Sequence, residues 1–161
     1  MLIIAKTPAP VSVEAGHYFQ GAQGRMFWNS LCDYRILTRP TDNYHDELLL
    51  NHGYGITDIA KVPRDFGDEP SDREYLAGTE RILKLIKTMQ PTVLMFVYKR
   101  VLDRMLSLAL NHPGKSKYGL NPDLDRKLGS RVFIFPMPGT PCTKAEAQSA
   151  MTQLSRIFNS D

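Results

Sequence analysis

Basic side chains gather between residues 99 and 131, where eight Lys and Arg stand against three Asp and leave a net charge of +5 over 33 residues. Contacts with phosphates need such a local surplus even where the whole chain is nearly neutral. An ordinary solvated loop between charged helix ends would look the same, so both interpretations stay open. The side chains that we expect on a nucleic-acid backbone are Lys99, Lys115, Lys117, Arg126 and Lys127.

Histidine and cysteine side chains form no recognisable metal or nucleophile motif. His45 and His52 have no cysteine or carboxylate at the spacing of a zinc site, so we interpret them as solvent-facing. Cys142 comes just before a predicted helix, where a thiol pKa can fall, but no catalytic partner is readable beside it. The chain also has no GxSxG, no P-loop and no GxGxxG that opens a helix. We therefore expect neither a metal nor an organic cofactor.

Apolar runs that alternate with amphipathic segments predict how these side chains are positioned. Strands are predicted at 2–5, 92–97 and 131–135, and helices at about 25–34, 46–51, 71–89, 99–108 and 143–158. The weak alternation at 54–60 indicates either a short strand or an extended loop. Residues 11–24 and 111–130 are predicted loops because they are rich in glycine and polar residues. This alternation predicts an α/β fold, three-layer α/β/α with a central, mainly parallel four-stranded sheet.

Right-handed crossovers between parallel strands bring the loops that follow them to one edge of the sheet, where such folds bind ligands. The predicted loops at this edge begin at Lys6, Ile56, Tyr98 and Pro136. Two helix starts are also readable, because Ser71 and Thr143 are each followed three residues later by a glutamate, the spacing of a capping box.

Length and composition indicate one domain over residues 1–161, since 42% apolar and 23% charged residues are ordinary for a globular protein. The longest apolar stretch, residues 91–97, is too short to span a bilayer, and the start has no signal-peptide pattern. We therefore expect a cytoplasmic protein without a membrane partner. The charge is uneven, at −5 over residues 1–80 and +8 over residues 81–161.

Several short segments resemble, in order, those of one known family. Gly16-His17-Tyr18-Phe19 followed by Arg25-Met-Phe-Trp28 is similar to the GxxFxxxxNRFWxxL region of the uracil-DNA glycosylase superfamily. Residues 55–59 resemble its GxTxxV segment, 75–91 its ELxxGxxxLxxKIxxYQP helix, and 135–139 its LPNPSG loop. The resemblance is strongest to the mismatch-specific uracil/thymine-DNA glycosylases and their hypoxanthine-acting relatives, and it extends over nearly the whole chain.

The resemblance implies a pocket that receives a damaged or deaminated base flipped out of DNA, where the N-glycosidic bond is hydrolysed. Phe19 stands at the position of the aromatic platform on which the base stacks. A core position, packed with Phe27 and Trp28, is the alternative for this side chain. The resemblance implies as base-binding residues Phe19, Tyr18, Pro8, Met137 and Gly139.

The sequence departs from the family where the attacking water is activated. The family's Asn, Asp or Glu of the first loop is Thr7 here, and a hydroxyl can hold a water but is no carboxylate base. The Asn that the hypoxanthine branch carries before its FW pair falls on Gly24 or Arg25. Asp58 is the nearest acid, followed at longer range by His17, although a capping or turn role explains Asp58 equally well. The expected catalytic residues are therefore Thr7, Asp58 and His17.

Three functions remain open on these residues. The first is a monomeric DNA glycosylase in base excision repair, with DNA as its partner. The second is a catalytically inactive nucleic-acid or nucleotide-binding module of the same fold, which the loss of the usual water-activating residue favours. The third is an enzyme for a small nucleobase-like substrate, which an acidic first half would tolerate better than duplex DNA.

Overall fold

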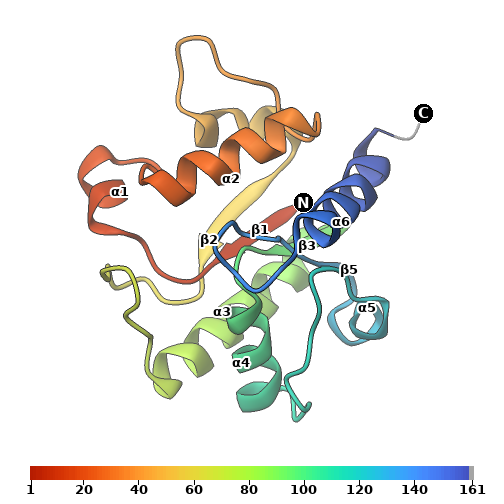
Figure 1. Cartoon of the computed structure of the whole chain (residues 1–161). Coiled ribbons are helices and arrows are strands. Elements are labelled where there is room, and N and C mark those ends of the chain that lie inside the picture. The colour runs from red at the N-terminus through yellow and green to blue at the C-terminus, as the bar shows by residue number, and fades with distance from the viewer. Residues whose placement is uncertain (160–161) are drawn as a thin grey trace.

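A five-stranded sheet in the order β2-β1-β3-β5-β4 forms the centre of the molecule, as the computed structural model of residues 1–159 shows (Figure 1). The last two residues of the predicted domain lie outside this range. Four strands are parallel: β1 (Leu2–Ala5), β2 (Gly55–Asp58), β3 (Val93–Phe96) and β5 (Arg131–Ile134). The α/β fold with a mainly parallel sheet is confirmed, and all four predicted strands are present.

The fifth strand, β4 (Gly119–Leu120), corrects the predicted count of four and lies inside the predicted 111–130 loop. It pairs antiparallel with Phe133 and Ile134 of β5. Two residues are too few to show a strand pattern in a sequence. Gly119 also has φ +82, and a Cβ there would lie 3.2 Å from the Ala150 Cβ, so glycine lets β4 pass close to the last helix.

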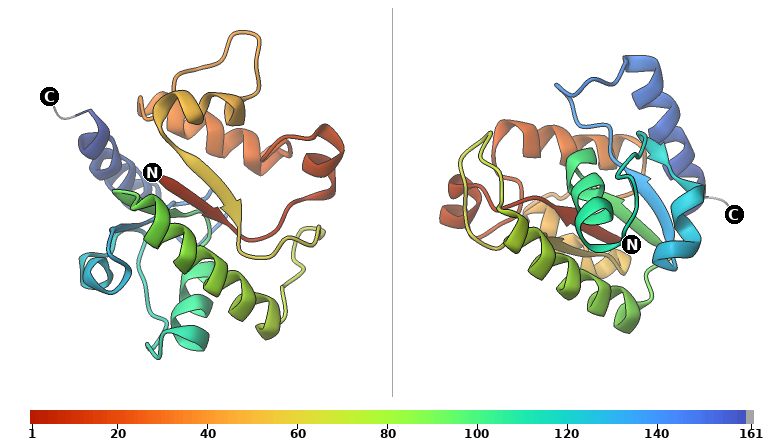
Figure 2. Two further views of the ribbon diagram at one scale, coloured as in Figure 1. Left: turned by 180° about the vertical axis from the view of Figure 1, so that it is seen from behind. Right: turned by 90° about the horizontal axis from the view of Figure 1, so that it is seen from below.

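Helices cover both faces of the sheet (Figure 2). On one face α2 (Ala22–Asp33) and α6 (Lys144–Phe158) pack on the buried side chains that the strands direct to that face, among them Ile3, Met95 and Phe133. On the other face α3 (Asp72–Met89), α4 (Lys99–Ala109) and α5 (Pro122–Leu128) pack on the alternate residues, among them Ile4 and Phe96. Both faces of β1 and β3 are therefore buried, as their unbroken apolar runs predict.

Helices that begin with a capping box were predicted from the sequence, whereas two short helices that begin with a proline were not. Ser71 and Thr143 each accept a hydrogen bond from the backbone N–H of the glutamate three residues on, so both predicted capping boxes are confirmed. The short helix α1 (Pro10–Ala15) and α5 lie in segments predicted to be loops. Each begins with a proline, which suits the first turn of a helix because its missing N–H has no partner there anyway.

Two one-turn 3-10 helices, η1 (His45–Leu48) and η2 (Leu50–His52), replace the predicted helix at 46–51 and lead into β2. After β2 the chain turns back under α3, where Gly78 permits the contact: a Cβ at this position would lie 1.9 Å from the carbonyl oxygen of Ile59. Among the described residues 1–159, no helix has the length and apolar character needed to cross a membrane.

Candidate active site

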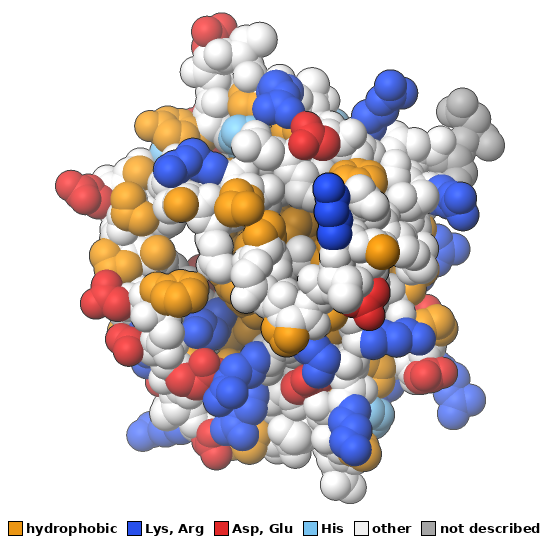
Figure 3. Space-filling view, viewed as in Figure 1, with side chains coloured by type: hydrophobic (Ala, Val, Ile, Leu, Met, Phe, Trp, Pro, Cys, Tyr) orange, Lys and Arg blue, Asp and Glu red, His pale blue; other side chains and the backbone are white. Residues whose placement is uncertain are grey.

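A cavity of about 930 Å³ opens where β1 and β2 end. Its wall comes from residues 6–13 after β1, the 16–24 loop, Asp58, the 61–67 segment, and Tyr98 at the start of α4. The predicted Pro136 loop reaches the same place through Gln23, whose Nε2 donates to the Pro138 oxygen at 3.3 Å. The segments after β1, β2, β3 and β5 do follow parallel strands to one edge of the sheet, but Ile56 lies within β2, so the second of them begins after Asp58 and not at Ile56. Figure 3 shows hydrophobic side chains gathered on the side of the molecule that carries α1.

Asp58 and Thr7 come to this cavity from neighbouring strands. Parallel pairing places Ala5 opposite Asp58, and the N–H groups of Ile59 and Ala60 donate to the oxygens of Ala5 (2.8 Å) and Lys6 (3.0 Å). The chain after β1 therefore runs beside the chain after β2. The structure brings together Thr7, Pro8, His17, Tyr18, Phe19 and Asp58 in the cavity wall.

Asp58 is a buried carboxyl group, 3% exposed, whose two carboxylate oxygens accept no hydrogen bond from residues 1–159. Burial raises its pKa from 3.8 to about 6, and the positive charges of Lys61 and Arg81 oppose the shift. A carboxyl group with this pKa, in a cavity and without a partner, is suited to accept a proton from a water near neutral pH.

Two cations beside Asp58 share one hydroxyl group. Lys61 Nζ and Arg81 Nη1 each donate to Thr57 Oγ1 at 3.0 Å, and Arg81 Nη2 donates to the Asp58 backbone oxygen at 2.5 Å. Burial lowers the pKa of the Lys61 amine; the Asp58 carboxylate opposes this shift, and the Arg81 charge adds to it. Sequence reasoning missed both cations, because Lys61 lies in the acidic half and Arg81 is distant in sequence on α3.

His17 lies in the wall but is held by acidic side chains. Its ring stacks on Tyr44 with centroids 3.6 Å apart, and its Nδ1 lies 3.0 Å from Asp46 Oδ1. Its Nε2 is 3.9 Å from Glu47 Oε1. Both ring nitrogens therefore face carboxylates, and Asp46 also accepts from the Tyr18 backbone N–H at 2.9 Å. This arrangement positions the 16–20 loop, and a catalytic role for His17 stays a prediction.

Phe19 satisfies both interpretations of the sequence. Its ring packs on Phe27 and Trp28, with centroids 4.9 and 5.8 Å away, and it also lines the cavity. Its backbone has φ +57, an unusual conformation for a side chain of this size. Gly24 permits this fold of the loop, since a Cβ there would lie 2.2 Å from the Phe19 oxygen. Trp28 Nε1 donates to the Tyr18 oxygen at 3.1 Å and braces the same turn.

Met137 and Gly139 are the predicted base contacts that lie outside the cavity wall. Met137 is only 2% exposed and belongs to the core beneath α2 and α6. Gly139 lies in the exposed turn that follows, with φ +85. Their predicted role in binding a base remains untested.

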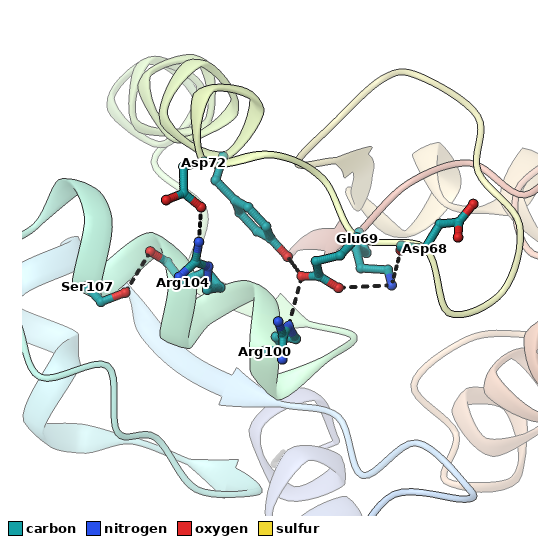
Figure 4. Close-up of polar contacts among 8 residues, drawn as sticks. Asp68, Glu69, Asp72, Arg100, Arg104 and Ser107 are labelled. Carbon is teal, nitrogen blue, oxygen red and sulfur yellow. Dashed lines mark hydrogen bonds and ion pairs between the residues drawn. The ribbon is translucent and has the colours of Figure 1, made fainter.

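Charged contacts hold the 61–70 segment in place as the outer wall of the cavity (Figure 4). Glu69 accepts hydrogen bonds from the Tyr75 hydroxyl at 2.5 Å and from Arg100 Nε at 2.9 Å. Lys6 Nζ donates to the Asp68 oxygen at 2.8 Å and lies 3.4 Å from Glu69. At the tip of the segment Phe66 lines the mouth of the cavity and is 91% exposed. The Phe66 ring is thus held by an anchored segment at the entrance of the cavity, where it can contact a ligand.

The predicted basic side chains lie at both ends of α4 and in the segment that follows it. Lys99 is the first residue of α4 and pairs with Asp103 at 2.6 Å, whereas Lys127 Nζ donates to the oxygen of Leu110 just after the last turn of the same helix, at 3.2 Å. Eleven helical residues, about 16 Å, separate these two ends. Lys115, Lys117 and Arg126 are exposed. Contacts of all five side chains with DNA stay a prediction.

His45 and His52, predicted to face solvent, are half-buried. The His45 ring stacks on Trp28, with centroids 5.5 Å apart and planes 7° apart, and burial lowers its pKa. The His52 ring nitrogen Nε2 lies 2.9 Å from Thr38 Oγ1. Both histidines therefore have structural partners. Over residues 1–159 there is no group of three or more His, Cys, Asp and Glu that is placed to hold a metal ion.

Comparison with known proteins gives one family. The model of the uracil DNA glycosylase superfamily matches residues 1–145, nine-tenths of the chain and all of the cavity wall. No curated protein matches the chain.

Proposed function

Since this chain belongs to the uracil-DNA glycosylase superfamily, we propose that it binds a damaged or deaminated base of DNA in the cavity and hydrolyses the N-glycosidic bond. One observation carries the hydrolytic part of this proposal. The buried Asp58 carboxyl, with no hydrogen-bond partner among residues 1–159 and a pKa of about 6, lies in the same wall as Thr7, the family's water-activating position.

The flipped base would lie on Phe19, whose ring is fixed from behind by Phe27 and Trp28. Stacking of a base on an aromatic side chain supplies about 1–3 kcal/mol. Gln23 is suited to the polar edge of the base. Its amide is oriented by the Tyr98 hydroxyl (3.2 Å) and by the Pro138 oxygen, which leaves one amide proton and one acceptor position for the ligand.

Bond cleavage would then follow from a water held between Thr7 and Asp58. The ionised Asp58 accepts the proton of the water as it attacks C1′ of the sugar, and its negative charge also stabilises the positive charge that develops on the sugar. The leaving base takes its electron pair away from C1′, next to the cations of Lys61 and Arg64 that line the cavity. This reaction consumes only water, so we propose no cofactor.

The basic side chains would serve the phosphate backbone, with one domain acting as a monomer on DNA. Lys99 lies beside Tyr98 of the cavity wall and is the best placed of the five predicted contacts. The exposed Phe66 would contact a neighbouring base at the mouth of the cavity.

A second candidate, a binding module without catalysis, is favoured by Thr7 and by His17, whose Nδ1 lies 3.0 Å from Asp46 and whose Nε2 lies 3.9 Å from Glu47. The two candidates predict different products. We would incubate the protein, in excess, with duplexes that carry uracil, hypoxanthine, xanthine or thymine opposite guanine, and then cleave abasic sites with hot alkali.

Strand breaks at one of these bases would support the glycosylase. Asp58→Asn should then lower the single-turnover rate by about 10²- to 10⁴-fold, the usual contribution of a general base. Asp42→Asn, an exposed carboxylate of the 41–43 turn, is the matched control. Absence of abasic product from all four duplexes, with retained binding measured by fluorescence anisotropy, would favour the binding module.

A further inference from the structure

We propose a second activity in this cavity: the Lys61 amine forms an imine with the aldehyde of an abasic site and cleaves the DNA strand by β-elimination. This inference rests on the proposed function, because an abasic site is the product that base excision leaves in the cavity. It assigns to one side chain a chemistry that hydrolysis does not require.

Lys61 differs from the other lysine of the cavity wall in what it contacts. Lys6 is held by the Asp68 oxygen and by Glu69. Lys61 Nζ donates only to Thr57 Oγ1 and forms no ion pair within 4.0 Å with a carboxylate of residues 1–159. Its amine is thus the one that remains free for a substrate carbonyl.

Arg81 makes the neutral amine of Lys61 more accessible. Lys61 Nζ and Arg81 Nη1 donate to the same atom, Thr57 Oγ1, each at 3.0 Å, so the guanidinium lies close to the ammonium. A neighbouring fixed cation and partial burial both disfavour the protonated amine, and this is a known way to activate a lysine for imine formation. Burial is the main cause of the lowered pKa of Lys61; the Asp58 carboxylate opposes this shift, and the Arg81 guanidinium adds to it.

The reaction balances without any oxidant or metal. The lone pair of the neutral amine attacks C1′ of the ring-opened sugar, and the carbinolamine loses water to form a protonated imine. A base removes a proton from C2′, its C–H electron pair forms the C2′=C3′ bond, and the C3′–O bond breaks with its pair on the departing phosphate. Water then hydrolyses the imine and releases Lys61 and an unsaturated aldehyde on the 3′ end.

Asp58 is placed to accept the C2′ proton. Its carboxylate lines the same wall, interacts electrostatically with Lys61, and accepts no hydrogen bond from residues 1–159 that would compete for its lone pairs. Base and nucleophile therefore come from one short segment at the end of β2, where Asp58 pairs with Ala5 of β1 and the Ala60 N–H, just before Lys61, donates to the Lys6 oxygen at 3.0 Å.

The test uses DNA that already contains an abasic site, prepared by another glycosylase, so that it does not depend on base excision by this protein. Incubation with sodium cyanoborohydride should reduce the imine and produce a covalent protein–DNA adduct, visible as a shifted band in a denaturing gel. Without the cyanoborohydride, the DNA strand should be cut at the abasic site. Mass spectrometry of the digested adduct should place the sugar remnant on Lys61.

Lys61→Arg keeps the positive charge but should lose both adduct and nicking. Lys84→Arg, on the exposed side of α3 where Lys84 pairs with Glu80, should retain both. Circular dichroism and thermal melting check the fold of each variant. An adduct that maps to Lys6 or elsewhere, or no adduct with the wild-type protein, would overturn the proposal even if Lys61→Arg fails to fold.

The result also separates this proposal from base excision. Abasic product from a uracil or hypoxanthine duplex without any borohydride adduct leaves the glycosylase and overturns the lyase. An adduct on preformed abasic DNA without excision of any base supports the lyase chemistry and overturns the glycosylase.

Discussion

Asp58→Asn should be more stable than the wild type at neutral pH, and the difference in unfolding free energy between the two proteins should grow as the pH rises. Burial raises the pKa of this carboxyl from 3.8 to about 6. At 1.36 kcal/mol per pKa unit, this shift of about two units corresponds to roughly 3 kcal/mol. Below pH 3.8 the carboxyl is protonated in both the folded and the unfolded chain, so it adds no penalty there.

The sign follows from proton binding. As the pH rises from 3.8 to 6, the unfolded chain releases the Asp58 proton first and then binds fewer protons than the folded one, so this group lowers the stability of the fold. Above pH 6 the whole penalty of burying the charge is present. Asparagine does not titrate, so the difference in unfolding free energy between Asp58→Asn and the wild type should grow by roughly 3 kcal/mol over this range.

Urea unfolding of both proteins at pH 4, 5, 6 and 7.5 measures this difference, and thermal melting should show it as a change of roughly 6–12 °C. Asp42→Asn, at an exposed turn, should stay within about 0.5 kcal/mol of the wild type at every pH. A difference that does not change with pH, or that falls as the pH rises, would refute both the burial of the Asp58 charge and its proposed role as the base.

Three further perturbations test the wall of the cavity and the DNA surface. Gly24→Ala should lower the free energy of unfolding in urea by about 1–3 kcal/mol, because the new Cβ would lie 2.2 Å from the Phe19 oxygen. The control Gly21→Ala, where the nearest atom is a Val11 methyl at 3.8 Å, should lower it by less than about 1 kcal/mol. Equal losses would contradict the close approach at Gly24. Glu69→Gln should speed hydrogen exchange of the 61–70 backbone amides about tenfold, since it weakens the charged contacts to Lys6 and Arg100. The control Glu80→Gln, on the surface of α3, should leave these exchange rates unchanged. Lys99→Glu should lower the slope of log K against log salt for DNA binding by about one unit, and Lys127→Glu, at the other end of α4, should not; a similar effect of both would extend the DNA surface to α5.

Local patterns in the sequence were enough to predict most of the framework. The apolar runs at 2–5, 93–97 and 131–135 are strands because both of their faces are covered, and the capping boxes at Ser71 and Thr143 set two helix starts. The meeting of the strand-end loops followed from the handedness of parallel crossovers. Strand β4 and the helices α1 and α5 were missed, because such short elements depend on what they pack against.

The sequence by itself determined the α/β class, the edge of the sheet where the cavity opens, the resemblance to one superfamily and the presence of Asp58 near that edge. Tertiary structure decided which charges surround it. Arg81 comes from α3 and Lys61 from the acidic half of the chain, so charge totals along the sequence did not reveal that two cations meet at Thr57. The tertiary fold also buries Asp58, and burial, a property of the packed chain rather than of the residue, is what raises its pKa to about 6 and makes it a candidate base.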